Sequence, residues 1–112
     1  MIEFDFLKIE TFIPEEYVHK LRMSLNNINA LTVGGNYDNC MVVSKVTSFW
    51  RPLKGAHPFN GTINKLCEVE ELKVEFCCNN TLLEDVISTI KNVHPYEVPV
   101  INIIPVINPF KI

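Results

Sequence analysis

The tripeptide Lys8-Ile9-Glu10 has a counterpart 65 positions later, Lys73-Val74-Glu75, with the same Lys and Glu on either side of a β-branched residue. This repetition is the basis for interpreting the rest of the chain. Aligned without gaps at this offset, the two copies share apolar residues at eight pairs of positions: Ile9/Val74, Phe12/Cys77, Ile13/Cys78, Tyr17/Leu82, Val18/Leu83, Leu21/Val86, Leu25/Ile90 and Ile28/Val93. In each copy an extended apolar stretch leads into a segment whose apolar residues recur at intervals of three and four, which is typical of an amphipathic helix packed on a sheet. The pattern indicates two copies of one strand-helix unit.

One helix is predicted in each copy. The first begins near Pro14, whose missing N–H costs nothing in a first helical turn. The second is capped near Asn80 or Thr81, where a capping box of the form Thr-x-x-Glu begins at Thr81. It ends by His94, because Pro95 disfavours helical geometry at the preceding residue. The apolar stripes of the two helices are Tyr17, Val18, Leu21, Leu25 and Ile28, and Leu82, Leu83, Val86, Ile87, Ile90 and Val93.

Five strands are predicted from runs of β-branched and aromatic residues. They cover residues 6–13, 40–44, 46–51, 72–78 and 100–106. Two strand-helix units with a hairpin between them and a final strand describe an α+β ferredoxin-like sandwich, a double β-α-β arrangement in which two helices cover one face of an antiparallel sheet. Because the strands carry many apolar residues, we expect further copies of the chain to cover the other face or the edges.

Length and composition restrict the class of protein. The 112 residues are expected to form one domain, residues 1–112. Ten Lys and Arg against thirteen Asp and Glu give a net charge of -3, which argues against a nucleic-acid partner. No apolar run approaches the roughly 18 residues that cross a bilayer, so no membrane partner is expected. The acids near the N-terminus predict no signal peptide and a cytoplasmic location, with all four cysteines as free thiols.

Four segments carry a resemblance to a known family. They are Ile13-Pro14-Glu15-Glu16, Gly35-Asn36-Tyr37-Asp38-Asn39-Cys40, Arg51-Pro52-Leu53-Lys54-Gly55-Ala56-His57-Pro58-Phe59 and His94-Pro95-Tyr96-Glu97-Val98-Pro99. In this order they resemble the inserted domain of the NGG-interacting-factor (Nif-three-like) family, over residues 6–106. That domain is similar to the CutA and PII proteins, ferredoxin-like modules that typically assemble as trimers. The resemblance therefore implies a PII/CutA-like fold, a cytoplasmic protein and a homo-oligomer, with a trimer favoured.

The resemblance does not extend to the family's metal chemistry. Full-length members carry a dinuclear metal site and are often labelled as a type of GTP cyclohydrolase, but the ligands lie in flanking halves that this sequence does not contain. No position here inherits a metal ligand. Val98, Ile101 and Asn102 stand in a region where the family usually has acids, which weakens any cation site there. Lys54 replaces a usual glutamate and makes its loop more basic.

The candidates for ligand binding lie in the predicted loops or at the ends of the predicted helices and strands. They are Asp38, Arg51, Lys54, His57, His94, Tyr96 and Glu97. Arg51 and Lys54 suit an anion such as phosphate or carboxylate, since a guanidinium fork and an ammonium group both bind such oxygens. His94 has a structural alternative, in which its ring caps the last carbonyls of the second helix. No cofactor is predicted, and no metal site either, because His94 and Glu97 supply two ligands where a stable site takes three or four.

Three functions remain open from the sequence. The first is a non-enzymatic oligomeric module that binds a small ligand or a partner protein at clefts between subunits. The second is divalent-metal binding of the CutA type, with His94 and Glu97 joined by Asp38, His57 or cysteines. The third is an enzyme or enzyme subunit, for example with Cys40 beside His94 or His57. No motif with a mechanism attached is present, so no catalytic residue is predicted.

Overall fold

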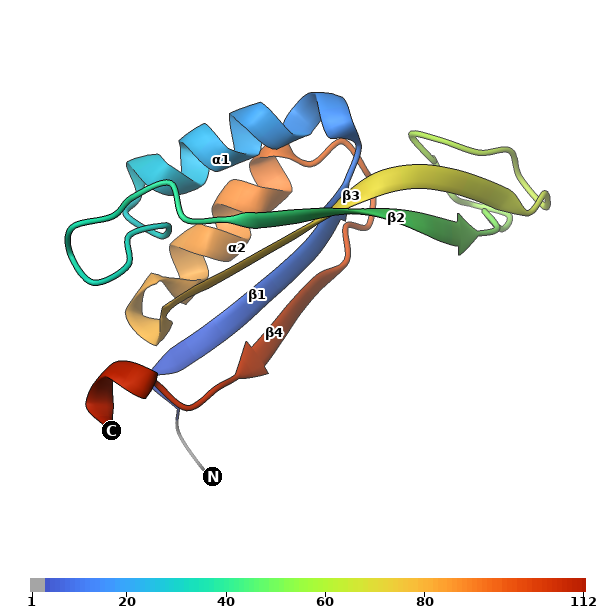
Figure 1. Cartoon of the computed structure of the whole chain (residues 1–112). Helices are drawn as coiled ribbons and strands as arrows, with labels where there is room; N and C mark the ends of the chain where they lie inside the picture. Colours follow the sequence, from blue (N-terminus) through green and yellow to red (C-terminus); the bar gives the residue numbers. More distant parts are fainter. Residues whose placement is uncertain (1–3) are drawn as a thin grey trace.

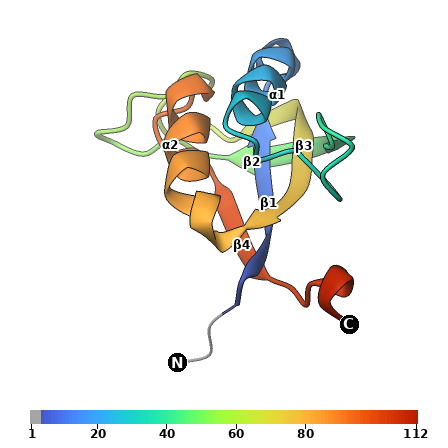
Figure 2. The ribbon, with the colours of Figure 1, turned by 90° about the vertical axis from the view of Figure 1, so that its left-hand side faces the viewer.

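The computed structural model describes residues 4–112 and contains one four-stranded sheet with two helices. The elements are β1 (Phe6–Ile13), α1 (Val18–Asn27), β2 (Val42–Trp50), β3 (Cys67–Asn79), α2 (Leu83–Val93) and β4 (Ile101–Pro105). The strand order is β2-β3-β1-β4, and every neighbouring pair is antiparallel. Both helices cover the same face of the sheet (Figures 1 and 2). The predicted ferredoxin-like sandwich is therefore confirmed.

The repeated Lys-x-Glu motif marks the centre of the sheet. Glu10 lies directly opposite Glu75, its equivalent in the repeat, in the β1–β3 register. Two carboxylates in this position repel each other, and the two lysines of the motif compensate for the repulsion. The Lys8 ammonium lies 2.8 Å from Glu75 and 3.4 Å from Glu10, while Lys73 lies 3.5 Å from Glu10 and 3.7 Å from Glu75. The hydrogen bond from Lys8 lowers the pKa of Glu75, so this carboxylate stays charged.

The core lies between the sheet and the helices, as the two apolar stripes predict. Every second residue of β1 is buried, including Ile9 and Ile13 at 0% exposure. From α1, Leu21 and Leu25 are fully buried, and the other residues of its predicted stripe pack against the same core. Alternate β1 residues such as Glu10 point to the opposite face, which no helix covers. The sheet therefore has one covered face and one open face.

The starts of the two helices differ in detail from the prediction. Pro14 precedes a short 3-10 helix, Glu15–Tyr17, that leads into α1. The second cap is not at Asn80 or Thr81 but one residue earlier, because the Asn79 side chain accepts a hydrogen bond from the Thr81 N–H at 3.0 Å. The end of α2 was predicted correctly: the helix stops at Val93, and the next residue is extended.

The strands predicted at 40–44 and 46–51 were wrong as separate elements, because residues 42–50 form the single strand β2. Only Lys45 lies between the two predicted segments, and a reversal of the chain there needs turn residues that the sequence lacks. The hairpin forms between β2 and β3 instead, with Trp50 opposite Cys67. Consequently β3 starts at Cys67, earlier than the predicted residue 72, and the hairpin extends past α1 and β4 (Figure 1).

Neither helix of the described residues is long and apolar enough to pass through a lipid bilayer.

Candidate functional site

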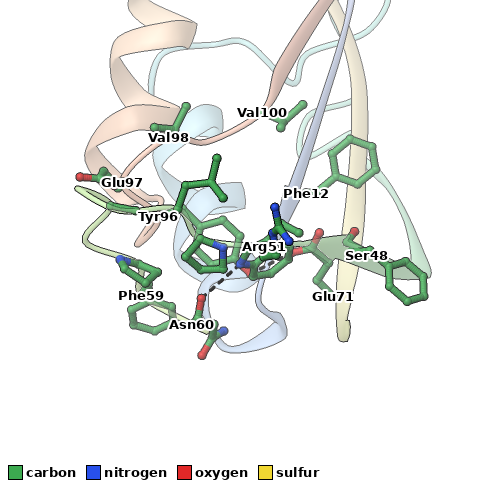
Figure 3. Close-up of a pocket in the computed structure, with 16 residues that line it drawn as sticks. Phe12, Ser48, Arg51, Phe59, Asn60, Glu71, Tyr96, Glu97, Val98 and Val100 are labelled. Carbon is green, nitrogen blue, oxygen red and sulfur yellow. Dashed lines mark hydrogen bonds between the residues drawn. The ribbon is translucent and has the colours of Figure 1, made fainter. Parts of the chain in front are cut away.

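A cleft of about 590 Å³ is lined by residues at one end of the sheet (Figure 3). The β2–β3 hairpin extends outwards at this end (Figure 1). The walls of the cleft come from four parts of the chain: the end of β2 with the loop that follows it, the loop between α2 and β4, the end of β1, and β3. The residues that line it are Phe12, Ser48, Phe49, Trp50, Arg51, Pro52, Leu53, Ala56, Pro58, Phe59, Asn60, Glu71, Tyr96, Glu97, Val98 and Val100. The cleft is thus largely apolar and aromatic, with a few polar groups, which is the usual character of a small-molecule site.

Aromatic rings hold the loop that follows β2 against the loop that follows α2. The Tyr96 ring lies 5.5 Å from the Trp50 ring and 6.0 Å from the Phe59 ring, measured between centroids. The Trp50 indole N–H donates a hydrogen bond to the Asn60 carbonyl at 3.2 Å (Figure 3). Gly61 has a φ of 109°, and a Cβ atom there would lie 3.1 Å from Pro52, so the loop needs glycine at this point. These contacts give the cleft an ordered wall.

Two polar contacts connect the segments around the cleft. The His57 backbone N–H donates to the Glu97 carboxylate at 3.0 Å, which joins the two loops. The Tyr96 hydroxyl donates to the Glu71 carboxylate at 2.9 Å, which joins the second loop to β3. Burial raises the pKa of Tyr96, and the hydrogen bond to Glu71 raises it further, so the hydroxyl remains a donor at neutral pH.

His94 supports the cleft from the end of α2. Its Nδ1 accepts a hydrogen bond from the Tyr96 N–H at 3.2 Å, so the ring proton is on Nε2, which donates to the Phe12 carbonyl at 2.6 Å. Burial lowers the pKa of His94 and keeps the ring neutral. The expectation that this ring caps the last carbonyls of α2 was wrong, because its donor is used by β1 instead. With both nitrogens engaged, the ring offers no free lone pair to a metal ion.

The structure brings most of the candidate residues to this end of the molecule. Arg51, Tyr96 and Glu97 line the cleft, and Lys54 lies in a turn between two lining residues. His57 contributes the backbone N–H that binds Glu97, and His94 supports the cleft through its hydrogen bonds to Phe12 and Tyr96. Their role in binding a ligand stays a prediction.

Asp38 lies apart from the other candidates. It belongs to the loop between α1 and β2. This loop lies at the opposite end of the molecule from the loop between β2 and β3, which lines the cleft (Figure 1). There the side-chain amides of Asn26 and Asn39 donate to its carboxylate at 3.3 and 3.0 Å, and they lower its pKa. Cys40 lies in the same loop, with its sulfur 3.5 Å from the Asp38 carbonyl. The structure therefore does not place Cys40 beside His57 as a catalytic pair requires.

Sequence reasoning did not single out Glu71 or the cleft roles of Trp50 and Phe59. Glu70 and Glu71 are adjacent in a strand, so their side chains point to opposite faces, but the sequence does not show which of the two is buried. In the structure Glu70 is exposed and Glu71 is buried. For the aromatic residues the sequence showed only that they needed packing partners.

The described part of the chain, residues 4–112, holds no group of three or more His, Cys, Asp and Glu side chains placed to bind a metal ion. Cys77 and Cys78 of β3 do not resemble activated nucleophiles either. Burial raises the pKa of Cys78 to about 11, and it also raises the pKa of Cys77. Thiols with raised pKa values carry little thiolate at neutral pH and react slowly.

Comparison with known proteins agrees with this fold. A "GTP cyclohydrolase 1 type 2 homolog" of Staphylococcus epidermidis is 34% identical over 99 residues, which cover 88% of this chain but 27% of the relative. This chain thus spans about a quarter of the length of the curated relatives that it matches. A Bacillus cereus protein related to NIF3 superposes with a TM-score of 0.80 and 26% identity, over 96% of this chain and 27% of the other. The resemblance to the Nif-three-like inserted domain is confirmed.

Proteins much shorter than these relatives have the same fold. The periplasmic divalent cation tolerance protein CutA of Archaeoglobus fulgidus superposes with a TM-score of 0.69 at 18% identity, over 92% of this chain and 85% of that one. The sequence model of the family described as CutA1 divalent ion tolerance protein matches residues 40–110, which is more than half of the chain. This chain belongs to the CutA1 family.

Proposed function

We propose that the chain, as a single domain of residues 1–112, is a non-enzymatic homo-oligomeric module that binds a small ligand in the cleft, where neighbouring subunits meet. The observation that supports it is the position of the cleft between the two open edges of the sheet. Ser48, Phe49 and Trp50 belong to the edge strand β2, and Val100 precedes the edge strand β4. A second chain paired with either edge lies against the cleft and completes its wall.

Exposed apolar residues around the cleft support assembly. Phe49 is 60% exposed, Val98 78% and Val100 54%. Val42, on the same edge strand as Phe49, is 63% exposed. An apolar edge strand of nine residues with a single lysine is a template for pairing with another chain. We therefore infer that copies of the chain cover these edges.

The two different edges suit a head-to-tail ring of subunits. The edge strands differ, because β2 has nine residues and β4 has five. Pairing of β2 from one copy with β4 of the next is a head-to-tail contact, and such contacts form a closed ring when the rotation between subunits allows it. We propose that the ring contains three copies.

The backbone of β4 suggests a direct test of this pairing. The Val106 N–H donates to the Phe6 carbonyl of β1 at 3.1 Å. Backbone groups alternate along an antiparallel strand, so those of Ile101 and Ile103 point away from β1. Pro105 has the same outward position and lacks an N–H. The Ile103→Pro variant therefore removes an outward donor and keeps the hydrogen bonds that hold β4 to β1.

We expect wild-type protein to sediment as a species of about three chain masses, and Ile103→Pro to sediment mainly as a single chain. The matched control is Ile103→Ala, which loses more apolar side chain than the proline variant but keeps the N–H, and which stays assembled. Sedimentation equilibrium at several concentrations measures the masses. A wild-type protein that is a single chain throughout contradicts the oligomer, and an Ile103→Pro variant that assembles like wild type contradicts the use of this edge.

We also propose a cytoplasmic location for this chain. The described cysteines are all free, as a reducing compartment favours, although the Archaeoglobus fulgidus relative is described as periplasmic. The activity in the names of the Staphylococcus relatives is not part of the proposal, because the match covers 27% of their length.

A further inference from the structure

The cleft contains a buried carboxylate that has no basic partner in the described part of the chain. Glu71 is 5% exposed, and its hydrogen-bond donor is the neutral Tyr96 hydroxyl. Among residues 4–112, no Lys or Arg nitrogen lies within 4.0 Å of the Glu71 carboxylate. Carboxylates at this depth in proteins are normally paired with a positive charge, because removing a charge from water is costly. A ligand can supply the positive charge that Glu71 lacks.

The walls beside Glu71 suit a cation with an apolar body. Trp50, Tyr96 and Phe59 form a continuous aromatic surface along one side of the cleft. The face of an aromatic ring carries negative electrostatic potential, so it attracts an ammonium group as well as apolar carbon. A volume of about 590 Å³ holds a molecule with a ring and a short side chain.

The charges that line the cleft favour a cation over an anion. Two carboxylates line it, from Glu71 and Glu97, against one guanidinium, from Arg51. Glu71 is buried, whereas Arg51 is exposed to solvent, where its charge is screened. A charge in a desolvated position acts on a ligand more strongly than an exposed one does.

We propose that the cleft binds an organic ammonium ion that carries an aromatic or comparably apolar body, with the ammonium group on Glu71 and the body against Trp50, Phe59 and Tyr96. This inference rests on the proposed function and defines its ligand class. It differs from the anion that Arg51 and Lys54 suggest in the sequence, because the buried charge in the cleft is negative.

Three probes of the same shape test the charge preference on the wild-type oligomer. They are 2-phenylethylammonium, the neutral 2-phenylethanol and the anionic phenylacetate, with affinity measured by isothermal titration calorimetry at pH 7.5. We expect the ammonium probe to bind at least about tenfold more tightly than the alcohol, since a charge-assisted hydrogen bond is stronger than a neutral one. Phenylacetate is expected to bind more weakly than either, because Glu71 repels it.

Variants test which residue causes the preference for the ammonium probe. Glu71→Gln is expected to lower the affinity for the ammonium probe roughly tenfold and to leave the affinity for 2-phenylethanol unchanged. The matched control is Glu70→Gln, an exposed glutamate on the same strand outside this cleft, for which no change is expected. Arg51→Met is expected to strengthen ammonium binding, because it removes a like charge.

The outcomes separate this inference from the proposed function. If phenylacetate binds most tightly and Arg51→Met abolishes its binding, the cleft is an anion site: the ammonium proposal is overturned and the ligand-binding module stands. Equal affinity for all three probes also overturns it, since the ring alone then explains binding. If no probe binds to an intact oligomer, both the ammonium proposal and the assignment of this cleft as the ligand site fail, and only the assembly remains.

Discussion

Replacing Leu25 with alanine is expected to lower the free energy of unfolding by about 2–5 kcal/mol, and replacing Ile90 with alanine is expected to cost a similar amount. The two residues are equivalent in the internal repeat, one on α1 and one on α2. Both are 0% exposed in the core between the helices and the sheet. Each substitution leaves a cavity that neighbouring side chains fill only in part, so the cost exceeds the simple transfer of the lost methyl groups to water.

Urea unfolding followed by circular dichroism measures these losses, at one fixed protein concentration because assembly adds to the apparent stability. Matched controls are Met23→Ala on α1, where the side chain is 50% exposed, and Lys91→Ala, an exposed residue on α2. We expect each control to change stability by about 0.5 kcal/mol or less. If Leu25→Ala costs several kcal/mol and Ile90→Ala costs no more than its control, the two halves do not contribute equally to one core.

The repeat explains why so much of the fold was predictable. Two copies of a strand-helix unit with apolar residues at three- and four-residue intervals can bury both stripes only by packing the two helices on one shared sheet. The sequence did not predict the register, in which the two glutamates of the Lys-x-Glu motif lie opposite each other at the centre of the sheet. The prediction was wrong for residues 40–51, because β2 is mostly exposed and shows little of the alternation of apolar and polar residues that marks a half-buried strand.

The site was less predictable, for a different physical reason. Tyr96 and Glu97 stood out because they follow a helix end marked by Pro95 and belong to a segment that carries the family resemblance. Glu71 lies within a long strand, and the tertiary fold places its carboxylate next to the Tyr96 hydroxyl. Contacts of this kind join residues 25 positions apart through the tertiary fold, and no local pattern encodes them.

His94→Ala is expected to cost roughly 3 kcal/mol of folding stability at pH 7.5. His94 is 6% exposed, and its ring packs against the Tyr96 ring with 4.6 Å between centroids. Alanine removes this packing, and it also leaves the Phe12 carbonyl and the Tyr96 N–H without their partners. Thermal or urea unfolding measures the loss, and the control is His19→Ala, an exposed residue of α1. A loss no larger than that of the control contradicts the buried role.

The same contacts make the contribution of His94 dependent on pH. Burial lowers the pKa of His94 in the folded protein below the value of about 6.5 in the unfolded chain, although the nearby Glu71 charge opposes the shift. Below about pH 6.5 the unfolded chain binds a proton at His94 more readily than the folded protein does. The free energy of unfolding therefore falls as the pH drops from about 6.5 towards the lowered pKa of the folded protein, and above pH 7 this group does not affect it. Protonation of Nδ1 also sets its new proton against the Tyr96 N–H. The stability advantage of wild type over His94→Ala should therefore shrink between pH 7 and pH 5, whereas carboxylate titrations common to both proteins cancel in the difference. An advantage that stays constant over this range means that His94 is protonated as easily in the folded protein as in the unfolded chain.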